Sequence, residues 1–481
     1  MMPSHTTKLF SNAFYLMTGR FISRLLQFVL FVYGSRLLGP GGFGVFCFAF
    51  AAAGVMSVFM DLGVSNYSVQ QMSRDRSLIP VYTGGGLLVR CGMVGVGPFF
   101  LMTAGFALGK DASTLWVLLI MGGMAALDSF TSQFSAVFQA VERMEYQAAV
   151  FVTSNLIFSV GGIVCITFFP SPEVLAAMFF LGALLRLSLS AYWHQKKFYP
   201  PCRPAQKYFL IDMLKKGSPF ALVSIFINIY SYIDSLILSA YASNETVGYY
   251  NAAYRLFEAP LFVTDSLTTA LFPAVSKLYR EDRQSLQKLL SGLIQKAVPL
   301  AMGVSLATAF LSGDVIRLLF GTQYDPAARV LPILMFTLII IAPNTILGAS
   351  LRAMDRQKLS AWMAGLACLL NVGLNLFIIP RYSYMGAAWT TLATEFFVLM
   401  VYFPLVWRIV GPLIDFFYVV KMIAYGAAVW AFFHLTGGLG FYGQAGLGLV
   451  AVMTMLFFFG FFKLDELLAL ARKRGPKQGW A

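Results

Sequence analysis

Residues 328–350 read ARVLPILMFTLIIIAPNTILGAS, and no Lys, Arg, Asp or Glu interrupts the stretch from Val330 to Leu351. A helix rises about 1.5 Å per residue, so about 20 apolar residues cross the hydrocarbon core of a bilayer. The stretch lacks the short alternating pattern of a membrane barrel strand. It therefore predicts a transmembrane helix.

Comparable apolar runs recur along the whole chain and predict fourteen spans. We expect them at 12–34, 43–63, 81–108, 113–138, 146–169, 173–193, 217–241, 247–273, 291–312, 328–350, 359–379, 384–406, 416–436 and 443–462. The longest polar connection, about 194–216, separates six spans from the next six. The predicted fold class is an all-α polytopic membrane protein with two six-helix lobes around a central cavity and two extra C-terminal helices.

The predicted domains follow from these spans. An N-lobe covers 1–205, a C-lobe covers 206–408, spans 13 and 14 cover 409–463, and a basic cytoplasmic tail covers 464–481. If the two halves are repeats of one another, an offset of 204 residues aligns them. That offset pairs Gly44 with Gly248, Ala49 with Ala253, Asp61 with Asp265 and Arg76 with Arg280, with few other identities.

Composition and charge placement exclude a soluble protein and a nucleic-acid partner. Charged residues make up 12% of the chain, against about 25% in soluble domains. The net charge of +14 comes from Lys and Arg in short connections between spans. With a cytoplasmic N-terminus, 23 of these cations lie inside and 5 outside, which is a clear positive-inside bias. We expect both termini in the cytoplasm and only short outside loops, the longest at about 313–327.

Charged side chains within the spans are the candidate site residues, because a charge at bilayer depth usually faces a partner or water. The cations expected to line a substrate cavity, where Arg suits a phosphate group, are Arg24, Arg20, Arg90, Arg186, Arg255 and Lys296. The acids that could couple transport to an H⁺ or Na⁺ gradient are Asp61, Asp128, Asp234, Asp265, Glu258 and Glu395. The structural alternative is that Arg255 and Glu258 neutralise one another, that Arg20 snorkels, and that polar stripes join helices.

Enzymatic chemistry has little support in the sequence. No P-loop, H-E-x-x-H or G-x-S-x-G pattern is present, and the Cys and His residues lack metal-site spacing. Gly84, Gly85 and Gly86 open a span and favour close packing over phosphate binding. We expect no catalytic residues, no resident metal and no cofactor.

Several local motifs occur in a characteristic order. They are Arg36-Leu37-Leu38-Gly39-Pro40 with Phe43-Gly44, Asp61-Leu62-Gly63, Asp234 with its apolar continuation, Val247-Gly248-Tyr249-Tyr250, Ala253-Tyr254-Arg255-Leu256, Pro273, Leu319-Phe320-Gly321 with Tyr324, Asn371, Pro380 and Met385-Gly386-Ala387-Ala388. Over residues 8–408 the chain resembles oligosaccharidyl-lipid flippases of the Wzx type, in the multidrug/oligosaccharidyl-lipid/polysaccharide (MOP) exporter superfamily.

The resemblance implies a function and partners. It implies that an undecaprenyl-diphosphate-linked oligosaccharide crosses the bacterial inner membrane by alternating access, for O-antigen, capsule or exopolysaccharide synthesis. Arg24 stands where the first-span arginine of such flippases would lie. The expected partners are the bilayer, the lipid-linked oligosaccharide, and a polysaccharide polymerase with its chain-length regulator.

Four alternatives remain open at this stage. A flippase for lipid-linked peptidoglycan precursor also has fourteen spans. A multidrug exporter of the same superfamily would favour an acidic, aromatic cavity, and the embedded Arg residues oppose it. A polysaccharide polymerase or ligase usually carries a large outside loop, which this chain lacks. A scaffold for an envelope-synthesis complex would leave the buried charges unexplained.

Overall fold

The computed structural model describes residues 5–198 and 206–462, apart from the side chains of 5–17, Arg20, 262–263 and 265–270. The predicted tail at 464–481 and part of the 194–216 connection lie outside this range. The helices are α1 His5–Asp61, α2 Val64–Arg74, α3 Ile79–Met93, α4 Val96–Ala107, α5 Ala112–Ala140, α6 Met144–Phe168, α7 Pro172–Lys197, α8 Lys207–Tyr241, α9 Asn244–Glu281, α10 Arg283–Phe310, α11 Ser312–Phe320, α12 Ala327–Ala353, α13 Gln357–Val410, α14 Phe416–Leu435 and α15 Phe441–Phe458.

The helices account for the fourteen predicted spans. Within the described residues, eleven helices or helix pairs are long and apolar enough to cross a membrane. Two of them, α1 and α13, are broken by a non-helical residue, Gly39 and Ser383 respectively, and each contains two predicted spans. The remaining predicted span, 247–273, falls on α9, a helix that is not among these eleven. The all-α, polytopic fold class is therefore confirmed, and the chain is a multi-pass membrane protein.

Two predicted connections contain short helices instead of open loops. The segment predicted as an outside loop at 313–327 forms α11 and a 3₁₀ turn at Thr322–Tyr324. Ile316 and Phe320, four residues apart, are buried on one face of α11, while Arg317 pairs with Asp325 on the exposed side. This one-sided burial explains why a segment too short to span is still helical.

The described chain divides into two compact units. Unit 1 holds residues 1–255, 319–324 and 364–387, and unit 2 holds 256–318, 325–363 and 388–481. This division differs from the predicted boundary at 205/206, because α8 packs against α1 and α2. The lobes at 1–205 and 206–408 stay a prediction about the sequence repeat.

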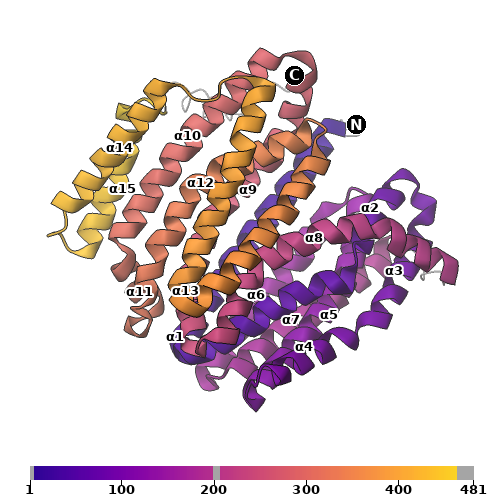
Figure 1. Ribbon diagram of the computed structural model, residues 1–481. Helices are drawn as coiled ribbons and strands as arrows, with labels where there is room; N and C mark the ends of the chain where they lie inside the picture. Colours follow the sequence, from indigo (N-terminus) through magenta and orange to yellow (C-terminus); the bar gives the residue numbers. More distant parts are fainter. Residues whose placement is uncertain (1–4, 199–205, 463–481) are drawn as a thin grey trace, which may run out of the picture. The chain divides into compact units, whose positions relative to one another are not determined.

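Aromatic side chains form much of the core of unit 1. Phe179 of α7 packs against Phe31 and Phe46 of α1 at centroid distances of 5.7 and 5.2 Å, and against Phe158 of α6 at 5.0 Å. In Figure 1, α5 and α7 run side by side within this unit. These contacts fix α1, α6 and α7 around one point.

A reciprocal backbone contact joins the beginning of α9 to the turn in α1. A Cβ at Gly44 would overlap the carbonyl oxygen of Asn244, and a Cβ at Gly248 would overlap that of Pro40. Pro40 and Asn244 are separated by the same 204 residues as Gly44 and Gly248. Each half therefore contributes the same two positions, as in a two-fold interface. This geometry supports the internal repeat.

The same turn receives the motif at 319–324, which is distant in sequence. The Arg36 Nε donates to the carbonyl of Leu319 at 2.7 Å, and the Gln323 side chain donates to the carbonyl of Arg36 at 3.0 Å. The buried Tyr324 hydroxyl donates to the carbonyl of Ser35 at 3.0 Å. Two of the sequence motifs thus form one packed corner of unit 1.

In unit 2, α10 packs against α12, α14 and α15. Tyr425 and Phe433 of α14 are buried, with Val452 and Leu456 of α15, in a cluster against α10. Figure 1 shows α14 and α15 side by side next to α10. This packing positions the two C-terminal spans on the unit that contains α10.

Candidate functional site: a polar cavity in unit 1

A cavity of ≈ 430 Å³ lies within unit 1, among five of its helices. Side chains from α1, α5, α6, α7 and α8 contribute to its wall. The lining residues are Ser23, Arg24, Gln27, Phe50, Gly54, Ser57, Met124, Ala125, Asp128, Phe151, Asn155, Phe179, Arg186 and Tyr232. The wall therefore combines charged, hydrogen-bonding and aromatic groups, which is typical of a site for a polar ligand.

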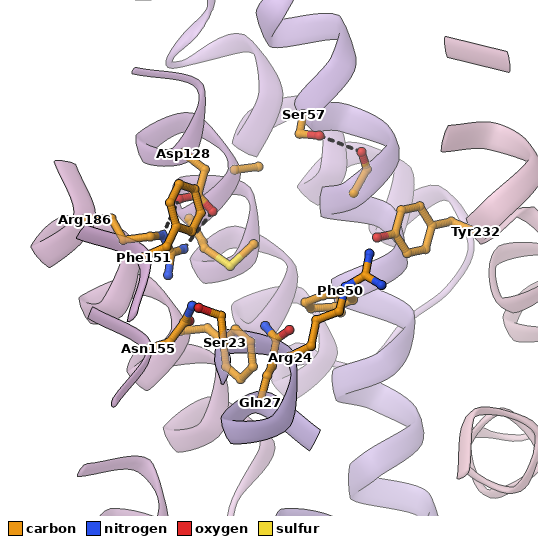
Figure 2. A pocket seen from close by; sticks show the side chains of 14 residues that line it. Ser23, Arg24, Gln27, Phe50, Ser57, Asp128, Phe151, Asn155, Arg186 and Tyr232 are labelled. Atoms are coloured by element: carbon orange, nitrogen blue, oxygen red, sulfur yellow. Dashed lines mark hydrogen bonds and ion pairs between the residues drawn. The ribbon is translucent and has the colours of Figure 1, made fainter. Parts of the chain in front are cut away.

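The first span presents Arg24 to this cavity. Ser23, Arg24 and Gln27 lie within one turn of α1 and all line the wall. The Arg24 side chain is exposed. In Figure 2 it lies on the side of Tyr232, away from the Arg186–Asp128 pair.

Arg186 and Asp128 form a bidentate ion pair in the cavity wall. The Arg186 Nε donates to one carboxylate oxygen at 2.9 Å, and one terminal nitrogen donates to the other at 2.8 Å. The Arg186 side chain is 8% exposed and that of Asp128 is 34% exposed. The Asp128 carboxylate is therefore more accessible from the cavity than the Arg186 guanidinium that it binds.

The cavity includes polar groups that the sequence reasoning missed. Asn155 of α6, Ser57 of α1 and Tyr232 of α8 all line it. An amide inside an apolar span is a recognisable signal, and Asn155 carries it. Ser57 and Tyr232 carry no comparable signal, because Ser and Tyr are common in membrane helices.

Arg255 of α9 lies beside the cavity without lining it. Its guanidinium sits over the rings of Phe31 and Phe50, at 4.3 and 5.2 Å from their centroids. Phe50 itself belongs to the cavity wall. Such cation–π contacts hold a guanidinium in a fixed place.

Arg90, predicted as a cavity cation, is not among the lining residues. It is 1% exposed and is ion-paired with Asp61. Its terminal nitrogens also donate to the carbonyl of Gly86, the side chain of Gln133 and the hydroxyl of Ser65, at 2.7–2.8 Å. The side chain of Gln133 fills the space where a Cβ on Gly86 would lie, so Gly86 serves packing.

Asp234, predicted as an ion-coupling acid, lies in a second polar cluster of unit 1. It is 6% exposed and accepts hydrogen bonds from the Tyr250 hydroxyl at 2.7 Å and the Asn375 amide at 2.6 Å. The Asn375 amide also donates to the oxygen of Asn371 at 3.0 Å. The structure therefore joins α8, α9 and α13 through polar groups from three predicted spans.

The remaining predicted residues lie elsewhere or outside the description. In unit 2, Glu395 accepts a hydrogen bond from Asn344 at 2.8 Å, and Glu258 and Lys296 are half-buried. None of these three lines the cavity of unit 1. The side chains of Arg20 and Asp265 lie outside the described residues. Across the described chain, no group of three or more His, Cys, Asp or Glu side chains forms a candidate metal site.

Comparisons with known proteins agree with the motifs. The family model described as "Polysaccharide biosynthesis protein" matches residues 9–279, and the MatE model matches 219–377. The probable low-salt glycan biosynthesis flippase Agl15 of Haloferax volcanii is 26% identical over 34% of this chain and 34% of its own length. The chain therefore spans about a third of that relative.

A second relative and a solved structure cover more of the chain. The probable flippase AglR of Haloferax volcanii is 22% identical over 76% of both chains. The lipid II flippase MurJ in an inward closed conformation has a TM-score of 0.76 at 17% identity, covering 92% of this chain and 98% of its own. That likeness shows the fold. With more than half of its length matched, the chain belongs to the polysaccharide biosynthesis protein family.

Proposed function

We propose that the protein is a flippase that moves a polyprenyl-diphosphate-linked oligosaccharide across the bacterial inner membrane by alternating access. The observation that carries the proposal is the cavity that contains Arg24 and the Arg186–Asp128 pair. Arg donates a planar fork of hydrogen bonds that matches phosphate oxygens. Family membership and relatives named as flippases support the same function.

The cavity suits a diphosphate head group with an attached sugar. Ser23, Gln27 and Asn155 offer donors and acceptors for hydroxyl groups, and Phe50 and Phe151 offer apolar ring surface. No bond of the substrate is broken in this mechanism. The lining cations oppose the alternative of a multidrug exporter for organic cations, while a peptidoglycan precursor would use the same diphosphate chemistry.

We also propose Asp234 as the carboxylate that couples transport to H⁺ or Na⁺. It is buried with Asn371 and Asn375, whose amide oxygens are ligands that hard cations accept. Asp61 is less suited to this role, because it compensates the buried Arg90.

The test of the proposed function is Arg24→Ala in cells that lack the chromosomal copy. We expect surface-glycan export to be lost while the protein still inserts in the membrane at the normal level, because the exposed cation that meets the head group is gone. Arg24→Lys keeps the charge without the fork and should restore only part of the export.

Arg143→Ala is the matched control. Arg143 is an arginine outside the cavity, 46% exposed and paired with Glu145, so its loss should leave export at the wild-type level. Normal export in Arg24→Ala, at normal expression, would refute the assignment of this cavity to the substrate.

A further inference from the structure

We infer that Asp128 is an internal stand-in for the substrate's phosphate, which holds the Arg186 fork until a head group displaces it, and that the displaced carboxylate takes up a proton. The inference rests on the proposed function, because it concerns the same cavity. It gives the Arg186–Asp128 pair a role in binding beyond holding α5 to α7.

The first step of the argument is that the Arg186 fork is occupied. Both carboxylate oxygens of Asp128 accept from the guanidinium, at 2.9 and 2.8 Å. A phosphate needs the same parallel donors that the carboxylate now uses. An incoming anion can therefore reach this face of Arg186 only if Asp128 leaves it.

The second step is that Asp128 is the partner able to move. Its side chain is 34% exposed and lines the cavity, whereas that of Arg186 is 8% exposed. A short carboxylate that already borders the open cavity can turn toward it without entering an apolar environment. The enclosed guanidinium stays where the pair has placed it, ready for a second anion.

The third step concerns the charges that surround Asp128. The ionisable groups of the cavity wall are Arg24 from α1, Arg186 from α7 and Tyr232 from α8, while α6 contributes only neutral residues and α4 has no ionisable side chain. One turn along α5, Ser132 contacts the Asp61–Arg90 pair, which joins the end of α1 to α3. Among the side chains that the structure describes on these helices, no further cation lines the cavity beside Asp128.

The fourth step follows from like charge. Once a diphosphate takes its place on Arg186, the Asp128 carboxylate shares the cavity with an anion. A nearby like charge favours the neutral acid, so a proton from water adds to the carboxylate as the head group binds. Release of the head group lets the proton leave and the ion pair re-form. Substrate binding is thereby linked to the uptake of one proton.

The sign of the pH dependence is fixed by this linkage. The protonated protein binds the head group better, so affinity is high at low pH and falls as the pH rises. With one linked proton the fall approaches about tenfold per pH unit. A diphosphate substituted at both ends is the right probe, since it lacks the phosphate monoester proton that titrates near a pKa of about 6.

The experiment measures binding of farnesyl-diphosphate-N-acetylglucosamine to the full-length protein in nanodiscs, from about pH 5.5 to pH 8, by calorimetry. We expect the wild type to lose affinity with rising pH and to take up close to one proton per ligand, as read from buffers of different ionisation enthalpy. Asp128→Asn should bind more tightly at neutral pH, with an affinity that no longer depends on pH.

Asp212→Asn is the control, because Asp212 also forms an ion pair, with Lys216, at an exposed site outside the cavity. It should reproduce the wild-type slope. A wild-type affinity that is flat with pH, or equal slopes in the wild type and Asp128→Asn, overturns the inference. The proton count in the wild type requires no variant, so it tests the inference even if Asp128→Asn does not fold.

These outcomes separate the two proposals. If the wild type binds the probe without proton uptake, and Arg24→Ala does not bind, the proposed function stands and the role of Asp128 is wrong. If the wild type and Arg24→Ala bind equally, or neither binds, the assignment of the cavity to the head group fails and the inference fails with it.

Discussion

Unit 1 contains two arginine–aspartate pairs, Arg90–Asp61 and Arg186–Asp128, whose surroundings differ. Arg90 is enclosed by Asp61, Ser65, Gln133 and the carbonyl of Gly86, and its side chain has no exposed surface. Arg186 lines an open space beside its partner. Burial of a charge is costly unless it is paired and hydrogen-bonded, and both terminal nitrogens of Arg90 are bonded, so the Arg90 network is a structural joint between α1, α3 and α5.

Asp61→Asn should therefore destabilise the protein strongly. It leaves the buried Arg90 guanidinium without its counter-charge, at a cost of about 3–5 kcal/mol. Thermal unfolding in detergent, followed by light scattering and tryptophan fluorescence, measures the loss. The double variant Arg90→Met/Asp61→Asn should recover much of the stability, since no uncompensated charge remains. An unchanged midpoint in Asp61→Asn would show that the network contributes little.

The sequence identifies charged residues at bilayer depth, but only some of them line the cavity. Arg24, Arg186 and Asp128 line the cavity, whereas Arg90 and Glu395 do not. The sequence places all of these at bilayer depth, but the direction of a side chain depends on the helices packed around it. Arg90 pairs with Asp61 and Arg186 pairs with Asp128. These pairings depend on how the helices pack together, so residue spacing along a single helix does not predict them.

At the scale of helices, the breaks in α1 and α13 fall where the spans were expected to end. Gly39 adopts φ 68° and precedes Pro40, so the chain turns where a Gly-Pro pair predicts it. Ser383 adopts φ 52° shortly after Pro380. Local chemistry therefore predicts span boundaries well. It did not predict α2 and α11, because short amphipathic helices resemble polar connections until their buried face is known.

The glycines that meet at the α1 turn allow a direct steric test. Gly248→Ala would place a methyl group on the carbonyl oxygen of Pro40, so the turn must separate. We expect a loss of about 1–3 kcal/mol in stability, as for an overpacked core. Gly92→Ala is the control, since nothing lies within 4 Å of a Cβ there. Equal melting temperatures for the two variants would contradict the reciprocal contact.

For the molecule as a whole, the distribution of cations predicts the orientation in the membrane. Charge counting places the 194–216 connection in the cytoplasm and 313–327 outside. The even number of spans gives both termini the same side. The helices and the eleven candidate spans of the described residues bear out the polytopic fold, and the orientation stays a prediction.

Cysteine labelling of intact cells tests that orientation. In a background without the native cysteines, Thr322→Cys should react with a membrane-impermeant maleimide, because Thr322 is exposed on the predicted outer side. Lys215→Cys, also exposed, should react only after the cells are permeabilised. The reverse pattern would invert the topology, and labelling of both in intact cells would refute the span count.

The reciprocal contact of Gly44 and Gly248 has a consequence for the history of the chain. Peptide carbonyl oxygens contact the α-carbons of two glycines, so the contact does not depend on the identity of neighbouring side chains. After a duplication, two copies joined in this way can diverge almost without limit and still recognise one another. A joint of this kind therefore permits the scarcity of shared residues between the halves, because it depends on two glycines and on backbone geometry.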